Sequence, residues 1–284
     1  LLKGPSHNAS KISGSTDESI QNKAGSNYNK FYSKYYDVLY QDKNYGQEVD
    51  YLNSLIKKFS RAKQPTLLEL GSGTGKHAYL LSKNHGYSIH GVDMSPEMVR
   101  VAQEKFAGRV EKGKLSYSVG DARTFRDPNR RKFDVILSLF HVVSYQITNE
   151  DLLREFKTAK THMNKNGLFI FDIWYGPAVL QQLPEERVKE MENDEVSVVR
   201  HARPEIHSLI NSVDVNYHIQ VTDKSTGEKF TFDEKHPMRY LFKPELEYLL
   251  SEVGIKLITA EEWVTGKSPD FKTWGVTIIG VSED

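Results

Sequence analysis

The stretch that decides the fold is Leu67-Leu68-Glu69-Leu70-Gly71-Ser72-Gly73-Thr74-Gly75, an apolar run followed by three alternating glycines. The run has the length of a buried strand, and glycine permits positive φ and a close approach of a ligand to the backbone. Two phosphate-binding motifs do not fit: Lys76 stands where GxGxxG has its last glycine, and His77 where GxxxxGK[ST] needs Ser or Thr. The sequence therefore predicts a strand–loop–helix ligand site of another type.

Strands and helices alternate regularly on both sides of this loop. The apolar pattern predicts strands that end at Asp93, Val119, Ser138 and Asp172, with helices near 76–84, 149–163 and 243–253. Such alternation is typical of an α/β fold with a doubly wound, mostly parallel sheet. Two final strands, near 255–264 and 273–282, are expected to form a reversed hairpin that completes a seven-stranded sheet.

The alternation stops after Trp174. Residues 195–202, 207–222 and 228–241 read as antiparallel strands, with a hairpin turn at 223–227. We expect residues 176–241 to form an antiparallel β cap, inserted after the fifth strand on the edge of the core. The core then comprises 28–175 and 242–284, with two N-terminal helices separated by Gly46. Residues 1–27, rich in Ser, Gly, Asn and Lys, are predicted to form an N-terminal extension.

Acidic residues follow the next two strands. Asp93 comes 22 residues after Gly71, and Asp121 lies in Gly120-Asp121-Ala122-Arg123. A carboxylate at the end of the second strand of such a sheet can accept hydrogen bonds from ribose hydroxyls, and ligands bind at the carboxyl ends of the strands. The pattern predicts an adenosine-containing ligand.

Glu69-x-Gly71-x-Gly73-x-Gly75 resembles motif I of class I S-adenosylmethionine-dependent methyltransferases. Further likenesses point to small-molecule N-methyltransferases that act on nucleotide-linked amino sugars of the desosamine and mycaminose type. They are Tyr36-Asp37-Val38-Leu39-Tyr40, Gly73-Thr74-Gly75-Lys76-His77, Ser138-Leu139-Phe140 with Tyr145, and His236 with Leu241-Phe242. The resemblance implies a Rossmann-like fold, S-adenosyl-L-methionine as cofactor, and transfer of a methyl group to a small-molecule amine.

The resemblance also assigns roles to residues. Because imidazole is best matched to proton transfer near neutral pH, His236 and His141 are candidate catalytic residues, together with Tyr40. Phe140, Tyr145 and Trp174 are expected to bind the acceptor. The residues expected to bind the cofactor are Tyr28, Tyr36, Glu69, Gly71, Ser72, Gly73, His77, Asp93, Met94, Asp121, Ala122, Arg123 and Leu139.

Composition disfavours several other classes of protein. Lys+Arg and Asp+Glu both total 38, so no positive field favours nucleic acid, and Ser138-Leu139-Phe140-His141 replaces the acidic or Asn residue before Pro-Pro-aromatic of base-modifying enzymes. No apolar run reaches 18 residues, so no membrane helix is expected. The chain has no cysteine, and histidines 201, 207 and 218 show no metal-ligand spacing, so no metal is expected.

We predict a cytoplasmic enzyme that forms a homodimer through the edge strands of the cap. Three alternatives stay open at this point. They are a small-metabolite O-methyltransferase, a non-catalytic adenosylmethionine-binding protein, and an NAD-dependent dehydrogenase, which Lys76 after Gly75 disfavours.

Overall fold

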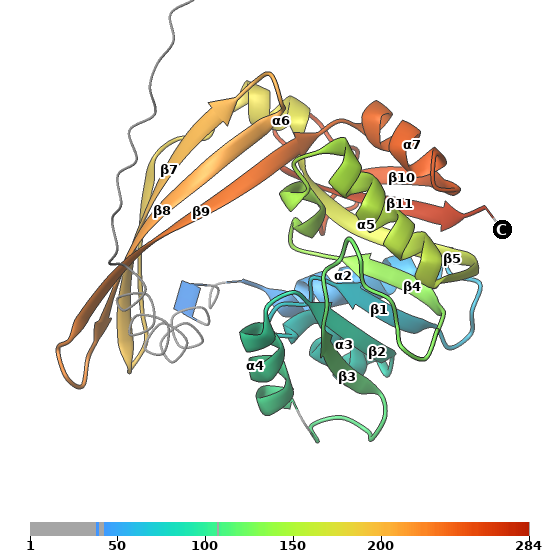
Figure 1. The fold of residues 1–284 in the computed structure, drawn as a ribbon, viewed down its shortest axis with the longest axis horizontal. Helices are drawn as coiled ribbons and strands as arrows, with labels where there is room; N and C mark the ends of the chain where they lie inside the picture. The colour runs from blue at the N-terminus through green and yellow to red at the C-terminus, as the bar shows by residue number, and fades with distance from the viewer. Residues whose placement is uncertain (1–37, 40–42, 107, 284) are drawn as a thin grey trace, which may run out of the picture.

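The computed structural model describes residues 38–39, 43–106 and 108–283, and it confirms the predicted fold class (Figure 1). Strands β1 to β5 are parallel, and β11 is antiparallel to both β5 and β10, which gives the core order β3-β2-β1-β4-β5-β11-β10. The core strands are β1 (Thr66–Leu70), β2 (Ser88–Asp93), β3 (Leu115–Val119), β4 (Phe133–Ser138), β5 (Met163–Tyr175), β10 (Ile255–Glu262) and β11 (Gly275–Ser282).

Successive residues of the core strands face opposite sides of the sheet, and each side buries its own cluster of apolar side chains. In β1, Leu67 packs with α2 (Tyr45–Phe59) and α3 (Lys76–His85), whereas Leu68 and Leu70 face α5 (Asn149–His162) and α7 (Lys243–Ser251). Helix α4 (Pro96–Phe106) lies beside α3, where the ring of Phe106 stacks on Tyr79 at 4.2 Å. Burial on both faces explains why the strands are continuously apolar.

Helix α2 begins earlier than predicted. Asn44 is its N-cap and accepts a hydrogen bond from the N–H of Gln47, so Gly46 lies in the first turn of the helix. The prediction that Gly46 separates two helices was wrong, because the Asn side chain replaces the missing backbone partner and starts the helix before the glycine.

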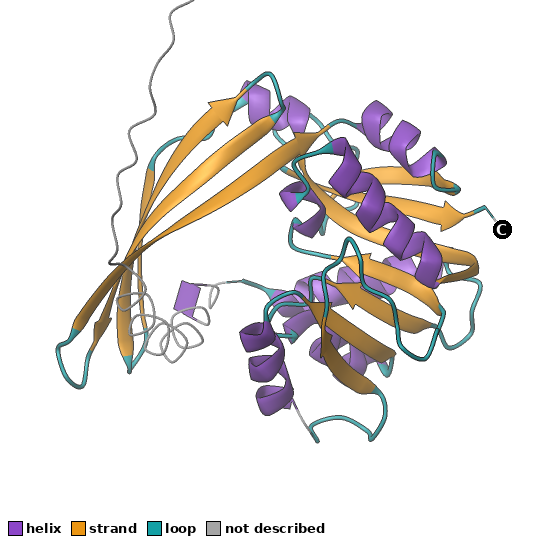
Figure 2. Ribbon diagram, viewed as in Figure 1, coloured by secondary structure: helices purple, strands orange, loops and turns teal. Residues whose placement is uncertain are grey.

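Four long antiparallel strands form the cap (Figure 2). Of these, β7 (Val196–His207), β8 (Ser212–Asp223) and β9 (Lys229–Leu241) were predicted. The short helix α6 (Gly176–Gln181) was not predicted, nor was strand β6 (Arg187–Glu192), in which four of the six residues are charged and only Met191 is buried. The two hairpins that join β7 to β8 and β8 to β9 hold the cap in a continuous register.

The sequence suggested that the cap lies on the edge of the core sheet. The structure shows instead that the cap joins the sheet at β5. Strand β9 runs parallel to the end of β5, pairing Trp174 with Tyr240 and Tyr175 with Leu241. Strand β4 ends at Ser138, opposite Phe171, so β5 extends beyond its neighbour and leaves an edge for β9. The cap therefore emerges from the middle of the sheet, directly above the carboxyl ends of the strands. Every helix in the described part of the chain is too short or too polar to cross a membrane.

Candidate functional site

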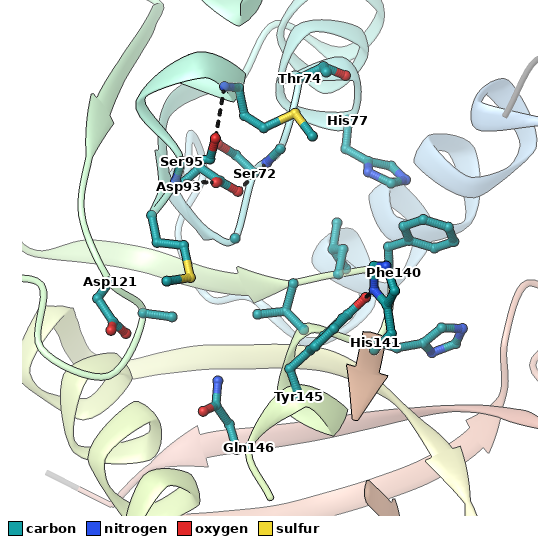
Figure 3. A pocket seen from close by; sticks show the side chains of 18 of the residues that line it. Ser72, Thr74, His77, Asp93, Ser95, Asp121, Phe140, His141, Tyr145 and Gln146 are labelled. Carbon is teal, nitrogen blue, oxygen red and sulfur yellow. Dashed lines mark hydrogen bonds between the residues drawn. The ribbon is translucent and has the colours of Figure 1, made fainter. Parts of the chain in front are cut away.

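A cavity of about 590 Å³, here the first cavity, opens at the carboxyl ends of β1, β2 and β4 (Figure 3). A second cavity of about 860 Å³ lies between the cap and the β10–β11 hairpin. The two share His141, Trp174, Val215 and Tyr217 in their walls. Because residues after the carboxyl ends of the strands and residues of the cap line these cavities together, this place is the candidate site.

The glycine loop forms one wall of the first cavity. Gly71, Gly73 and Gly75 all have positive φ, and a Cβ at Gly71 would lie 2.5 Å from Cγ2 of Val142. The N–H of Ser72 donates to the carbonyl of Val92, and the N–H of Gly73 donates to Oδ2 of Asp93 at 2.8 Å. The loop is thus fastened to the end of β2, and glycine is required both for its backbone angles and for its packing.

Asp93 presents a carboxylate into the first cavity from the end of β2. Its Oδ1 accepts from the N–H of Ser95 at 2.9 Å, and its Oδ2 from that of Gly73. Burial raises the pKa of Asp93, and the two N–H groups partly oppose that rise. Since a carboxylate has about four acceptor positions, it keeps the capacity to bind two neighbouring hydroxyls. The next side chain, Met94, is 67% exposed and offers an apolar surface beside it.

Asp121 lines the same cavity beyond β3, next to Ala122. The guanidinium of Arg123 binds the carboxylate of Asp121 with Nη2–Oδ2 at 2.6 Å, and this hydrogen bond lowers the pKa of Asp121. Arg123 also pairs with Asp151 on α5 at 3.3 Å. The pair fixes the Asp121 side chain in a single orientation against the cavity.

Glu69 and His77 lie behind the glycine loop. Glu69 is 1% exposed and does not line either cavity; burial raises its pKa to about 8. His77 lines the first cavity, while its Nε2 lies 2.7 Å from Oε2 of Glu48 on α2. The predicted contact of Glu69 and His77 with the cofactor stays a prediction. Because Glu69 is buried outside both cavities, its position favours a supporting role behind the glycine loop.

Phe140 and His141 follow β4 with φ of 64° and 65°. Non-glycine residues adopt this left-handed region only where the surrounding structure holds them, and such residues cluster at functional sites. Here the backbone N–H of His141 donates to Oδ2 of Asp172 at 3.1 Å, and Nδ1 of His141 lies 2.7 Å from the same oxygen. Burial alone would raise the pKa of Asp172, but the nearby His141 lowers it below the usual value. Asp172 therefore fixes the imidazole at the junction of the two cavities.

Tyr145 and His236 come from opposite sides of the first cavity. Tyr145 ends the 3-10 helix η1 (Val142–Tyr145), and its hydroxyl lies 2.8 Å from Nδ1 of His236 on β9. The first cavity also contains Trp174, whose ring meets Trp274 edge-to-face at 5.6 Å. Trp274, which directly precedes β11, lines the second cavity.

Most of the predicted site residues meet in the first cavity. These are Gly71, Ser72, Gly73, His77, Asp93, Met94, Asp121, Ala122, Arg123, Leu139, Phe140, His141, Tyr145, Trp174 and His236. Tyr28, Tyr36 and Tyr40 lie outside the described residues.

The first cavity also has lining residues that were not predicted from the sequence, among them Tyr45, Gln146, Tyr217 and Met238, and Asp172 lies behind it. Asp172 carried a usable signal, since it lies at the end of a predicted strand as Asp93 does. Tyr217 and Met238 follow from the register of the cap, in which Val215 pairs with His236 and alternate residues share a face.

The cap brings histidines and carboxylates together. His207 lies 2.8 Å from Asp214, and His218 lies 2.8 Å from Asp233. Ligand atoms of Glu205, His207 and Asp214 lie within 4.8 Å of one another, but Nζ of Lys235 is 2.8 Å from Asp214 and already supplies a positive charge. The absence of a metal thus stays a prediction.

Glu155 on α5 is a buried carboxyl near the floor of the first cavity. The hydroxyl of Ser138 donates to its Oε1 at 2.7 Å, while Oε2 has no hydrogen-bond partner among the described residues. Burial raises the pKa of Glu155 to about 7 from a usual value of 4.5. This carboxyl is therefore mainly protonated in the folded protein below pH 7.

We expect Glu155→Gln to lose less stability than the unchanged protein as the pH rises from 5 to 8. A carboxyl with a raised pKa keeps its proton on folding while the unfolded chain loses its proton, so the folded state is penalised as the pH rises toward 7. The difference between the two proteins should grow by on the order of 2 kcal/mol, measured by urea unfolding at each pH. Parallel pH profiles for the two proteins would contradict a buried, protonated Glu155.

Comparison with known proteins identifies the class of enzyme. Residues 67–167 match a family model described as a methyltransferase domain. The chain is 24% identical over 236 residues to the dTDP-3-amino-3,4,6-trideoxy-alpha-D-glucopyranose N,N-dimethyltransferase of Streptomyces venezuelae, covering 82% of this chain and 93% of that protein. The protein is a class I S-adenosylmethionine-dependent methyltransferase.

Solved structures support the fold of the methyltransferase. An S-adenosylmethionine-dependent methyltransferase from Clostridium acetobutylicum superposes with a TM-score of 0.72 at 23% identity, over 90% of this chain and 99% of that one. The S-adenosylmethionine-bound amino pentose methyltransferase CalS10 from Micromonospora echinaspora superposes with a TM-score of 0.67 at 18% identity. The match covers 88% of this chain and 95% of that one. These comparisons confirm the predicted class of enzyme and its cofactor, S-adenosylmethionine.

The residues of the methyltransferase fit this cofactor. The positive φ at Gly71 and the packing against Val142 leave no room for a Cβ. The loop therefore has no side chain at this position, and a ligand can approach its backbone closely. Asp93 supplies acceptors for neighbouring hydroxyls, and Met94 supplies an apolar surface for a flat ring. The buried hydroxyl of Ser72 has no hydrogen-bond partner among the described residues.

Proposed function

We propose that this methyltransferase transfers a methyl group to the amine of a small molecule, and that the acceptor is an amino sugar linked to a nucleotide. The observation that carries the proposal is the second cavity, which continues from the first one past His141 and Trp174. A single acceptor that reaches from one cavity into the other places its amine at the junction and the rest of the molecule under the cap.

The chemistry of the second cavity favours an acceptor that combines a flat ring with negative charge. Trp263 and Trp274 provide aromatic faces, and Arg187 and Arg200 provide cations. The guanidinium of Arg200 lies 4.5 Å above the ring of Tyr217, and its buried Nε has no hydrogen-bond partner among the described residues. Because a buried donor without a partner costs free energy, a phosphate oxygen of the acceptor would satisfy it.

The reaction needs alignment of the acceptor more than covalent catalysis. The bound cofactor supplies a sulfonium methyl group for an in-line displacement. The protein holds the acceptor amine at the junction of the cavities, and such positioning lowers barriers by roughly 7–11 kcal/mol. Aromatic rings beside the junction, including Phe140, Tyr145 and Trp174, exclude water and stabilise positive charge by cation–π attraction. A neighbouring imidazole or phenol accepts the proton that the amine must lose.

We expect Arg200→Ala to raise KM for a nucleotide-linked amino sugar about 10- to 100-fold, since a hydrogen bond to a charged group contributes roughly 1.5–3 kcal/mol. Affinity for the cofactor should stay unchanged, as should KM for the free amino sugar without its nucleotide. Steady-state kinetics with both acceptors provide the measurement. An equal rise in KM for the two acceptors would show that Arg200 acts through the fold of the cap and would contradict its contact with phosphate.

The acceptor class is tested with a panel of nucleotide-linked amino sugars, free amines and matched hydroxyl compounds. Methylation of the amines supports the proposal. Methylation of only the hydroxyl compounds would make the protein an O-methyltransferase, and tight binding of S-adenosylhomocysteine with no turnover of any compound would indicate a non-catalytic binding protein.

We also propose that the protein is a homodimer through the cap. Within the described part of the chain, strand β6 pairs with β7 alone and ends the sheet, so its other edge offers backbone groups to a second copy. Sedimentation velocity tests this: a monomer at micromolar concentration would contradict it. The location of the enzyme in the cytoplasm stays a prediction.

A further inference from the structure

Three side chains link the core to the cap in a row at the first cavity. The hydroxyl of Tyr145 lies 2.8 Å from Nδ1 of His236, and Nε2 of His236 lies 3.0 Å from Oε2 of Glu234. Tyr145 comes from η1 in the core, whereas His236 and Glu234 lie two residues apart on one face of β9. Tyr145 and His236 both line the cavity.

The chemistry of the three groups fixes the direction of their hydrogen bonds. The carboxylate of Glu234 can only accept, so Nε2 of a neutral His236 carries the hydrogen. Nδ1 is then the basic nitrogen, and it accepts from the hydroxyl of Tyr145. The Tyr145 side chain is 43% exposed and lines the first cavity, so its hydroxyl faces the place where the acceptor amine is proposed to bind.

We propose that Tyr145 is the catalytic residue that accepts the proton of the acceptor amine, and that Glu234 positions His236 behind it. The inference rests on the proposed function, since it names the proton path for an amine held in the first cavity. We call Tyr145, His236 and Glu234 the relay.

The step balances as a transfer of two protons along the relay. The ammonium group of the acceptor gives a proton to the Tyr145 oxygen, and the original hydroxyl proton of Tyr145 passes to Nδ1 of His236. The resulting imidazolium keeps its hydrogen bond to Glu234, and the neutral amine attacks the methyl group of the cofactor. The C–S bond breaks, the sulfonium becomes a thioether, and His236 returns its proton to solvent. The side chain of His236 is 29% exposed, which allows that exchange.

The surroundings of His236 are suited to this role. The ring of Tyr217 on β8 meets that of His236 edge-to-face at 5.1 Å and holds its plane. Arg200 on β7 lies over the other side of Tyr217. Among the described residues, the titratable and charged groups around the imidazole are Tyr145, Tyr217, Glu234 and, one ring further away, Arg200. Glu234 contacts Nε2 directly, so its charge stabilises the imidazolium.

The first test needs no acceptor. We would measure the nitrogen-15 chemical shifts of the His236 ring by NMR in the full-length protein, using His236→Gln to assign the signals. The relay predicts a neutral ring with hydrogen on Nε2, and Glu234→Gln should shift the Nε2 signal, because an amide replaces the carboxylate that accepts its hydrogen bond. Hydrogen on Nδ1 in the unchanged protein would overturn the proposal, because that nitrogen could not accept from Tyr145.

The second test compares three variants by steady-state turnover of an amine. Tyr145→Phe keeps the ring and removes the hydroxyl, so kcat should fall about 100-fold. Glu234→Gln should lower kcat roughly 10-fold and move the acid limb of the kcat/KM profile to lower pH, since the imidazolium loses its stabilising charge. Asp233→Asn is the matched control: it removes a carboxylate from the same strand, but one that pairs with His218 on the opposite, exposed face. The control should behave as the unchanged protein.

The outcomes separate the two proposals. If the unchanged protein methylates an amine and both Tyr145→Phe and Glu234→Gln keep its kcat and its acid limb, the relay is overturned while the proposed function stands. If the acid limb of the kcat/KM profile does not move in Glu234→Gln, that limb reports the acceptor amine itself, and the relay is again overturned. If no amine is methylated, the proposed function fails, and the NMR result still decides the arrangement of protons in the relay.

Discussion

Replacing Asp93 with alanine is expected to weaken binding of the cofactor about 30- to 150-fold, or roughly 2–3 kcal/mol. The variant removes the acceptors for the ribose hydroxyls. It also leaves the N–H groups of Gly73 and Ser95 without the carboxylate that now fixes both, so the glycine loop loses its tie to β2. Isothermal titration with S-adenosylhomocysteine measures the effect directly.

Glu97→Ala is the control for this prediction. Glu97 lies four residues after Asp93, in the first turn of α4, and its carboxylate pairs with Arg100 at 2.6 Å outside the first cavity. Its removal should leave affinity for S-adenosylhomocysteine unchanged. Equal affinity in Asp93→Ala and the unchanged protein would show that the ribose binds elsewhere, and the assignment of the first cavity would fall with it.

Phe156→Ala is expected to lower the free energy of unfolding by about 3–5 kcal/mol. The Phe156 side chain is fully buried on α5, and its ring lies 5.8 Å from that of Phe169 and 5.6 Å from that of Phe171. These rings form the contact between α5 and the middle of the sheet, so their loss leaves a cavity that the rigid strands cannot close.

Urea unfolding checks the effect of Phe156→Ala, with Tyr248→Ala as control. Tyr248 lies on α7 and is 63% exposed, so its truncation should change stability by no more than about 0.5 kcal/mol. A loss below about 1 kcal/mol for Phe156→Ala would mean that α5 does not depend on this cluster, contrary to the packing described above.

The core of the fold was predictable because its signals are local. The run Leu67 to Leu70 followed by alternating glycines defines one strand and its loop, and Asp93 and Asp121 mark the ends of the next two strands. Parallel strands place these ends at one edge of the sheet, so spacing along the chain was enough to predict that the residues expected to bind the cofactor lie together.

The acceptor side was less predictable because it depends on contacts between distant segments. Tyr145 and His236 are 91 residues apart, and their hydrogen bond requires both the turn after β4 and the register of the cap. The roles of Glu234 and Asp172 could not be predicted because each depends on a contact: Glu234 with His236, and Asp172 with His141, whose backbone is left-handed. Strand β6 has few apolar residues, so no periodic pattern revealed it.

The most direct measurement is a mass-spectrometric assay of methyl transfer from S-adenosylmethionine to a nucleotide-linked amino sugar. The matched acceptor carries a hydroxyl in place of the amine, and every other part of the two molecules is the same. We expect the amine to gain the mass of at least one methyl group and the hydroxyl compound to stay unchanged. Methylation of the hydroxyl compound alone, or no methylation of either while the cofactor binds tightly, would contradict it.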